Sequence, residues 1–383
     1  MSIISSLAAA ALSHDNTVKQ RFFGSMDIRY NTLVCGGGTG TLAEQRAQRL
    51  IFEKMNHTYM NHSPSIVLVQ NRNIADELYE TYGNHITIYG LNRSFNPFDI
   101  CHSADDVAFI LGRVADESNR TKHRAGNPSD IRLWSDMIAS ILQMYRYPIS
   151  YQAADNIVSL LFTSSGMEDF CRTVAEETGQ RDLPSSLKQS LNRLWNRSLN
   201  EFQHFWNEFS RQTEMLHALR ENEQCDQIIA YLPETDSELT KAALFAELQL
   251  LCRYGVSFTL LSIDVPLGEE ALPLFSEYPN RVTFGIYTRR IDRISPCFDS
   301  LTANLENMVC LGVNGHDANT LLQFYSSQTP KWMPHIEAHG IGAGKGFVPS
   351  YTAADFMPGR IADGGAMIYI RSKGRFKKAK VFL

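Results

Sequence analysis

A glycine cluster between an apolar run and a helix-forming run constrains the fold of this chain most. Asn31–Cys35 reads NTLVC, which is typical of a short buried strand, and GGGTGT follows it directly at Gly36–Thr41. Leu42–Asn56 is rich in Ala, Glu, Gln, Arg and Leu, which favour a helix. A strand, a glycine loop and a helix in this order begin a nucleotide-type βα unit.

The alternation of strand and helix continues along the chain. A helix over Ile74–Tyr82 separates expected strands at Ser65–Val69 and His85–Tyr89. Later strands are expected at Gln227–Leu232, Val256–Ile263, Arg281–Ile286, Asn307–Leu311, Ala366–Ile370 and Lys378–Leu383, with helices over Ser237–Cys252 and Ala318–Ser326. This pattern predicts an α/β fold in which helices cover both faces of a parallel sheet.

Strand signals are almost absent between about Ser103 and Glu223. One apolar helix face recurs there at spacings of four and three, at Trp195, Leu199, Phe202, Trp206 and Phe209. Such a stripe indicates core packing in a helical bundle. We therefore predict an N-terminal lead-in (1–24), an α/β domain in two segments (25–102 and 224–383) and an inserted all-α domain (103–223).

Composition narrows the classes of function. The net charge is −5, so nucleic-acid binding would need a local basic patch. No stretch provides the ~20 apolar residues that cross a bilayer, and the short run Leu7–Leu12 lacks the positive charges of a signal peptide. The seven cysteines are scattered without a CxxC pair and no HExxH occurs, so we expect free thiols, no metal site and a cytoplasmic protein.

The glycine cluster departs from a working phosphate-binding loop, whose form is GxxxxGK[ST]. The residues that occupy the eight positions are Gly37, Gly38, Thr39, Gly40, Thr41, Leu42, Ala43 and Glu44. Leu42 puts a side chain where the backbone approaches phosphate, and Ala43 removes the cation that reaches the β and γ phosphates. Glu44 replaces the hydroxyl that holds Mg²⁺ with a carboxylate that repels phosphate. We expect no ordinary Mg-ATP binding.

This loop resembles that of the conjugative coupling ATPases, the TraD/TraG-like proteins of type IV secretion in the FtsK/HerA group. Further stretches resemble the family in order over about residues 25–383: Ser65–Val69, the turn Asn96–Asp99, the helical block after it, the Walker B strand Gln227–Glu234, the helix-to-strand step Arg253–Ile263, Val309–Leu322 and Tyr351–Lys380. The resemblance implies a RecA-like P-loop NTPase sheet with an inserted all-α domain. It also implies protein partners at a membrane-bound secretion complex.

The chain departs from this family where phosphoryl transfer takes place. The Walker B strand of the family ends in Asp-Glu, and here the pair reads Pro233-Glu234. By gap-free counting the arginine-finger position falls on Cys252, with Arg253 one step away, and the γ-phosphate-sensing glutamine falls on Ser262. Phosphoryl transfer depends on positioning and charge stabilisation, so these losses predict a pseudo-ATPase that retains only Glu234 as a remnant.

Two further stretches carry charge or glycine. Gly340–Gly346 reads GIGAGKG, but His339 stands at the first glycine position, so we interpret Ser327–Gly346 as loop-like, with a phosphate nest for a neighbouring subunit as the alternative. The basic C-terminal residues are Arg371, Lys373, Arg375, Lys377, Lys378 and Lys380. They predict either a charged edge strand or a patch for DNA or an acidic partner. A smaller cluster, Arg289, Arg290 and Arg293, we interpret as solvated.

Two classes of function follow. The first is a pseudo-ATPase without cofactor, acting as a scaffold or adaptor beside an active coupling ATPase or other subunits of a conjugation or secretion assembly. The second is an active DNA-dependent ATPase motor that binds ATP and Mg²⁺ in an atypical site, using Glu234, Lys345 from the second glycine stretch and Arg253 from a neighbour. A DNA-binding module that uses the basic tail alone is a weaker alternative. Monomer, dimer and mixed ring all remain open.

Overall fold

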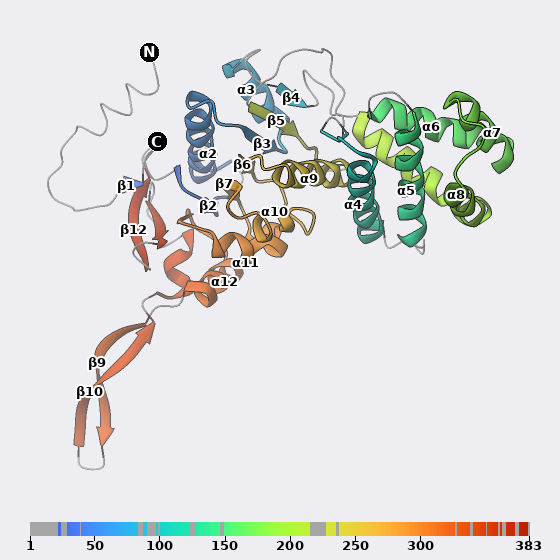
Figure 1. The fold of residues 1–383 in the computed structure, drawn as a ribbon. Coiled ribbons are helices and arrows are strands. Elements are labelled where there is room, and N and C mark those ends of the chain that lie inside the picture. The colour runs from blue at the N-terminus through green and yellow to red at the C-terminus, as the bar shows by residue number, and fades with distance from the viewer. Residues whose placement is uncertain are drawn as a thin grey trace. The chain divides into compact units, whose positions relative to one another are not determined.

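The chain divides by residue contacts into two compact units, whose elements are labelled in Figure 1. Unit 1 comprises Met1–Val67, Thr259–Gly268 and Thr283–Leu383, and unit 2 comprises Leu68–Phe258 and Glu269–Val282. In this computed structural model the described residues are 22–23, 29–38, 40–82, 87–89, 97–98, 100–122, 128–145, 149–214, 227–234, 237–325, 328–337, 340–349, 351–358, 361, 365–371 and 375–381. The domain boundaries expected from the sequence stay a prediction.

Unit 1 is built on a mostly parallel sheet. Its strands lie in the order β1 (Phe22–Phe23), β12 (Arg375–Val381), β11 (Gly365–Ile370), β8 (Asn307–Cys310), β2 (Thr32–Cys35), β7 (Val282–Thr288), β6 (Phe258–Ile263) and β3 (Ser65–Val69). The strand β2 runs parallel to both neighbours, with Val34 beside Tyr287 of β7 and Val309 of β8. Strand β11 is antiparallel to both of its neighbours, β12 and β8. The predicted α/β fold is confirmed.

The central strands of this sheet are covered on both faces. Every residue of β2, β3, β6 and β8 is buried. Continuous apolar runs are typical of parallel strands that helices cover on both sides. The helical elements of unit 1 are α2 (Leu42–Met60), η3 (Ile291–Ile294), α11 (Ser295–Ala303), α12 (Gly315–Tyr325) and η4 (Ala353–Phe356).

Helix α2 lies close to β7 at a glycine. A Cβ atom at Gly285 would lie 2.7 Å from Cδ of Lys54 and 3.0 Å from Cδ2 of Leu261. The Lys54 side chain is buried, and its Nζ donates a hydrogen bond to the Tyr30 carbonyl at 2.6 Å. Burial lowers the pKa of Lys54 to about 7, although the Glu306 carboxylate acts in the opposite direction. The contact between α2 and β7 therefore buries the Lys54 side chain between the helix and the sheet.

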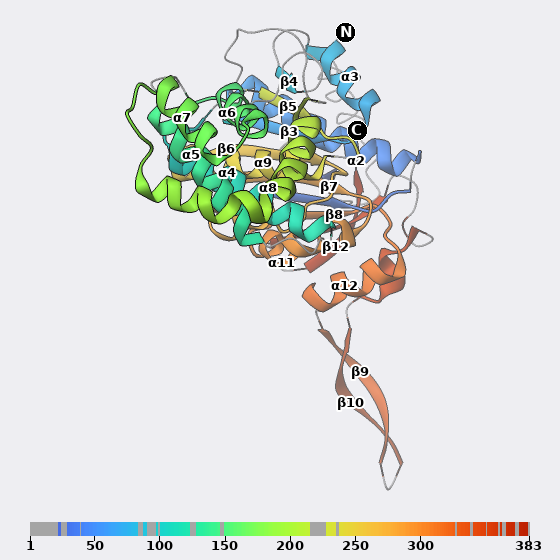
Figure 2. The same cartoon turned by 90° about the vertical axis from the view of Figure 1, so that its right-hand side faces the viewer.

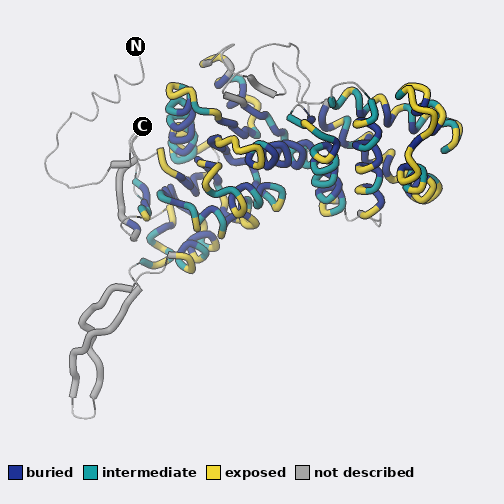
Figure 3. The backbone as a smooth tube through the Cα atoms, viewed as in Figure 1, coloured by how far each residue is buried: buried dark blue, intermediate teal, exposed yellow. Residues whose placement is uncertain are grey.

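Unit 2 contains two parallel strands and a run of helices. Strands β4 (Thr87–Tyr89) and β5 (Gln227–Tyr231) pair with Ile88 beside Ile229. The helices are α3 (Arg72–Tyr82), α4 (Ala104–Lys122), α5 (Pro128–Met144), α6 (Tyr151–Thr163), α7 (Met167–Glu177), α8 (Ser185–Glu214), α9 (Glu238–Arg253) and α10 (Leu272–Ser276). Figure 2 shows α4 to α8 gathered together, as the sequence predicts for this stretch. Helix α9 is buried along most of its length (Figure 3).

Aromatic side chains fill the core of the helical bundle. The ring of Phe202 stacks on Trp134 of α5 at 5.3 Å, and Trp206 stacks on Tyr151 of α6 at 5.9 Å. Both indoles are satisfied, because Trp134 Nε1 donates to Ser198 and Trp206 Nε1 donates to Asp155. The interpretation of the stripe on α8 as core packing is confirmed for Phe202, Trp206 and Phe209, which are buried, whereas Trp195 and Leu199 are half-buried.

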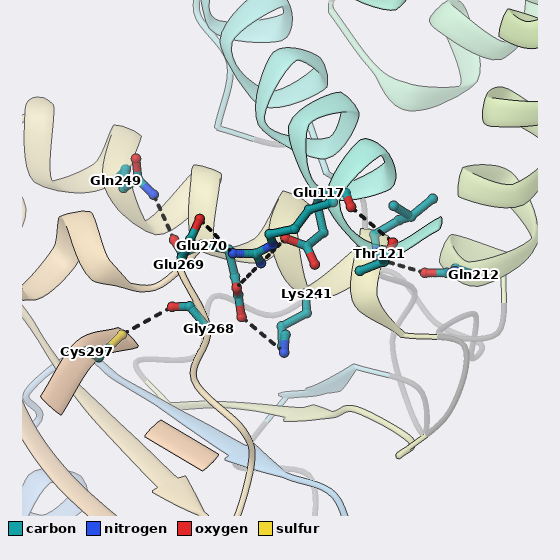
Figure 4. A network of polar contacts seen from close by, with 11 residues as sticks. Glu117, Thr121, Gln212, Lys241, Gln249, Gly268, Glu269, Glu270 and Cys297 are labelled. Atoms are coloured by element: carbon teal, nitrogen blue, oxygen red, sulfur yellow. Dashed lines mark hydrogen bonds and ion pairs between the residues drawn. The ribbon is translucent and has the colours of Figure 1, made fainter. Parts of the chain in front are cut away.

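Charged side chains tie α4 to α9 and to the segment before α10 (Figure 4). Arg120 of α4 pairs with Glu117, and with Glu269 and Glu270 at 3.0 Å each. Lys241 of α9 also reaches Glu270 at 3.0 Å. Burial raises the pKa of Glu117, with Glu270 adding to the rise. Partly buried ion pairs of this kind hold the three segments in one arrangement.

The stretch expected as a loop at 327–346 is a hairpin, so that prediction is wrong. Strands β9 (Gln328–Glu337) and β10 (Gly340–Pro349) pair antiparallel along their full length, with Trp332 beside Lys345. The glycines 340, 342, 344 and 346 alternate with larger residues, which is the period of a strand. The number of these glycines favours a loop, whereas their spacing indicates a strand.

Candidate functional site: the glycine loop of unit 1

The glycine loop leaves β2 in a conformation that requires glycine. Gly36 and Gly37 have φ angles of +93° and +85°, and Gly40 has +73°. A Cβ atom at Gly36 would lie 2.4 Å from the Gly312 carbonyl oxygen. The backbone N–H groups of Gly36 and Gly37 donate at 3.1 Å to the carbonyls of Thr288 and Gly312. These two N–H groups hold the loop against neighbouring segments and do not face a ligand.

The end of the loop is closed by Glu44. Thr41 caps α2, and its Oγ1 accepts a hydrogen bond from the Glu44 N–H at 3.2 Å. The Glu44 carboxylate turns back and accepts a hydrogen bond from the Gly40 N–H through Oε2. A carboxylate near a helix N-terminus is stabilised by the exposed N–H groups and the helix dipole. The chain's own anion thus occupies a donor that a phosphate loop offers to its nucleotide. Thr39 lies outside the described residues.

A partly buried ionic cluster lies where β6 and β7 end. Asp264, which follows β6 directly, accepts a hydrogen bond from the Arg289 N–H at 2.9 Å. Its carboxylate also pairs with the Arg289 side chain, and with Arg293 at 3.4 Å. Asp264 has a φ angle of +54°, which is uncommon for a residue other than glycine. The interpretation of Arg289 and Arg293 as solvated is therefore wrong, because the Asp264 carboxylate, 25 and 29 residues upstream, meets them.

The Glu44 carboxylate also interacts electrostatically with this cluster. Partial burial opposes the charged form of Arg289, but the carboxylates of Asp264 and Glu44 raise its pKa. Burial raises the pKa of the neighbouring Tyr287, and Asp264 and Glu44 raise it further. Tyr287 is fully buried, and its Oη has no hydrogen-bond partner in the described part of the chain. The sequence did not single out Asp264 or Tyr287; the position of Asp264 directly after a buried strand was the available signal.

Ser262 stands on β6 at the position that counting assigned to the sensor glutamine. Its side chain is fully buried, and its Oγ has no partner among the described residues. A serine is shorter than glutamine and carries no amide.

The other predicted site residues belong to unit 2. Pro233 and Glu234 follow β5, and Glu234 is exposed. Cys252 is buried on α9, and burial raises the pKa of its thiol to about 11. The Arg253 guanidinium lies 4.0 Å from the centre of the Phe109 ring, and its Nε donates to Tyr278 Oη at 3.4 Å. Arg253 is therefore engaged within its own unit.

The basic tail lies partly on β12. Arg375, Lys377, Lys378 and Lys380 belong to this strand, whereas Lys373 lies outside the described residues. The exposed Arg371 donates through Nη1 to the Ala303 carbonyl at 2.9 Å. Strand β1 pairs with β12 beside Lys380 and Val381, so β12 is not a free edge along its whole length.

Metal ligands do not gather anywhere in the described residues, where no group of three or more His, Cys, Asp or Glu side chains forms a metal site. Six cysteines carry free thiols there: Cys35, Cys101, Cys171, Cys252, Cys297 and Cys310. Cys225 lies outside that part. Within the same residues no helix is long and apolar enough to cross a membrane.

The fold and the loop together define an α/β protein with a RecA-like P-loop sheet and an inserted helical bundle. Two solved structures that share it are the bacterial conjugative coupling protein TrwB lacking its first 70 residues, and the plasmid coupling protein TrwB in complex with ADP and Mg²⁺. The TM-scores are 0.57 and 0.52, both at 10% sequence identity, with 97% and 96% of this chain and 90% and 89% of those chains covered. VirB4 of Thermoanaerobacter pseudethanolicus also aligns, with a TM-score of 0.46, 10% identity and coverage of 95% of this chain and 92% of that chain. No protein-family model and no curated protein matches the chain.

Proposed function

We propose that this chain is a catalytically degenerate relative in fold of the conjugative coupling ATPases. In this proposal it acts as a scaffold or adaptor in a conjugation or type IV secretion-type assembly. It binds protein partners there, such as an active coupling ATPase, and works in the cytoplasm or at the periphery of the membrane complex. No nucleotide or metal cofactor is part of the proposal.

The hydrogen bond between Glu44 and the Gly40 N–H carries this proposal. A phosphate that entered the loop would have to displace this carboxylate and would then lie beside its negative charge. Two unit charges of the same sign at 4 Å repel by about 4 kcal/mol at an effective dielectric constant of 20. Ala43 provides no cation to offset that repulsion.

The residues at the other motif positions also favour a protein without catalytic activity. Pro233 replaces the aspartate that orders Mg²⁺ in the coupling family, and the buried Ser262 lacks the amide of the sensor glutamine. Arg253 is stacked on Phe109. A phosphoryl-transfer site without its lysine, its magnesium ligands and its sensor loses most of the charge stabilisation on which the reaction depends.

An active motor is the second candidate, because the same fold occurs in TrwB complexed with ADP and Mg²⁺. In that version ATP and Mg²⁺ would bind despite Glu44, and Glu234 would activate water. Lys345 and Arg253 would be supplied by neighbouring subunits. Hydrolysis that DNA stimulates and that Glu234→Gln abolishes would establish this candidate. A role for the basic tail in DNA binding belongs with it.

Calorimetric titration of the purified chain with Mg-ATP, Mg-ADP and a non-hydrolysable ATP analogue tests the proposal. We expect no heat of binding up to millimolar nucleotide. TrwB, titrated with the same nucleotide solutions, is the positive control. Saturable binding to this chain would contradict the proposal and favour the second candidate, an active motor.

A further inference from the structure

The two edges of the β9–β10 hairpin differ in their capacity to accept another strand. In the described part of the chain neither strand pairs with any third strand. Each strand therefore has one side with backbone groups that its partner does not use. Such groups recruit an additional strand unless the sequence prevents it.

The register identifies these outward groups. Pro330 pairs with Phe347, and Pro334 pairs with Ala343. Proline has no N–H, so neither can be a hydrogen-bonded pair of the antiparallel ladder, in which both residues donate. Both are non-hydrogen-bonded pairs, in which the backbone N–H and C=O groups point away from the partner strand. The outward positions therefore recur at every second residue through these pairs.

The outward edge of β9 is blocked and that of β10 is open. On β9 the outward positions 330 and 334 are prolines, which cannot donate to an added strand. On β10 the outward positions Ile341, Ala343, Lys345 and Phe347 all have an N–H, and the outward position at the end of the strand, Pro349, lacks one. A strand can therefore add to β10 over about seven residues and cannot add continuously to β9.

We propose that β10 pairs with β10 of a second copy of this chain. Antiparallel pairing about a two-fold axis gives a four-stranded sheet in the order β9, β10, β10, β9. The same edge serves both copies, which is the condition for a closed two-fold interface. Both outer strands of that sheet are the proline-blocked β9 edges, so assembly stops at two copies.

The residue pattern of the hairpin favours β10 of a second copy, rather than an unrelated peptide, as the added strand. The register puts Trp332 beside Lys345, Ile336 beside Ile341 and Pro330 beside Phe347, and all six positions share one face of the ribbon. A two-stranded ribbon is marginally stable by itself, whereas three or more strands with an apolar face are stable. Pairing two copies doubles the apolar face and completes such a sheet. This inference does not rest on the glycine loop or on the proposed function.

Sedimentation velocity of the full chain, from low to high micromolar concentration, tests the pairing. We expect a dimer for the wild type and a monomer for Ala343→Pro, because proline at this outward position leaves the ladder of the hairpin intact, as Pro330 and Pro334 do. Gln328→Pro places the same residue at an outward position of the blocked strand and should leave the dimer unchanged. Replacing Pro330 and Pro334 by threonine opens the second edge, and we expect species larger than a dimer.

Amide hydrogen exchange of peptides from 340–349 provides the second readout. In the wild type the protection of these amides should rise with protein concentration. A wild type that stays monomeric, a dimer that survives Ala343→Pro, or β10 protection that is independent of concentration would each overturn the proposal. Protection that appears only on adding another protein would also overturn it, because an unrelated strand would then be the occupant.

Discussion

The Glu44 carboxylate accepts a hydrogen bond from the Gly40 N–H, four residues before it in the glycine loop. This contact makes the loop complete without a ligand. In the proposed function, a nucleotide would have to compete with this carboxylate, which is covalently part of the chain. Under the proposed function, the motif residues would exclude nucleotide through occupation of this donor as well as through loss of the cation.

Restoring the motif should restore nucleotide binding. We expect the triple variant Leu42→Gly, Ala43→Lys and Glu44→Thr to bind Mg-ADP saturably below millimolar concentration, because it frees the Gly40 N–H and supplies the missing cation. Gln45→Lys adds the same charge one residue beyond the motif and serves as the matched control. Calorimetry measures both. A triple variant that is folded and still gives no heat would show that Glu44 is not what excludes nucleotide.

Two loop glycines should differ in their tolerance of alanine. Both have a positive φ angle, but a Cβ atom meets the Gly312 carbonyl at Gly36 and open space at Gly40. We expect Gly40→Ala to lower the free energy of unfolding by about 1 kcal/mol, from backbone strain alone. Gly36→Ala should cost at least about 3 kcal/mol, since it adds a clash with backbone. Urea denaturation compares the two variants, and equal losses would contradict the contact at Gly312.

The stability of the protein should rise with pH above neutrality because of Lys54. Its pKa falls from 10.5 to about 7 in the folded state, so the unfolded chain binds more protons between these values. The free energy of unfolding therefore increases with pH across this window, by up to about 1.4 kcal/mol per unit from this group. Lys54→Met keeps the apolar stem and removes the amine, so its unfolding free energy should lack this slope. Urea denaturation from pH 6 to pH 10 compares the two proteins. Equal slopes would mean that Lys54 stays charged.

The negative charge of Asp264 should contribute more to the stability of the protein than the volume of its side chain. Asp264→Asn tolerates the positive φ angle but removes the negative charge that pairs with Arg289 and Arg293, and we expect the free energy of unfolding to fall by about 3 kcal/mol. Asp264→Ala adds backbone strain and should lose about 1 kcal/mol more. Arg290→Ala is the control, because Arg290 pairs with the half-exposed Asp292 and should change stability by less than about 1 kcal/mol. Thermal unfolding orders the variants, and an Asp264→Asn protein as stable as the wild type would contradict the cluster.

The sequence was sufficient for the sheet and the bundle because both follow local periodicity. Strands such as β2 and β6 are apolar at nearly every residue, and the stripe on α8 has the spacing of one helix face. The Glu44 substitution was also visible. Its hydrogen bond to Gly40 was not, because it depends on the turn that the loop makes between the two residues.

The elements that escaped prediction depend on pairing across long separations. Strands β9 and β10 contain prolines and glycines that locally indicate a loop, and only their antiparallel register reveals a ladder. The partnership of Asp264 with Arg289 joins residues 25 positions apart, at the ends of two strands whose adjacency the sequence alone does not specify. Charge clusters read along the chain therefore appear solvated when they are buried in the fold.

Gly285 leaves room for α2, the helix that begins at the glycine loop, to lie close to β7. Lys54 lies ten residues beyond Glu44 on α2, which is about 15 Å along the helix axis. A methyl group at Gly285 would press on the Lys54 stem at 2.7 Å, and a rigid helix transmits a push at one end as a tilt at the other. A residue larger than glycine at 285 would therefore displace the helix that begins at the glycine loop. A substitution at Gly285 would therefore perturb the loop without replacing any of its residues.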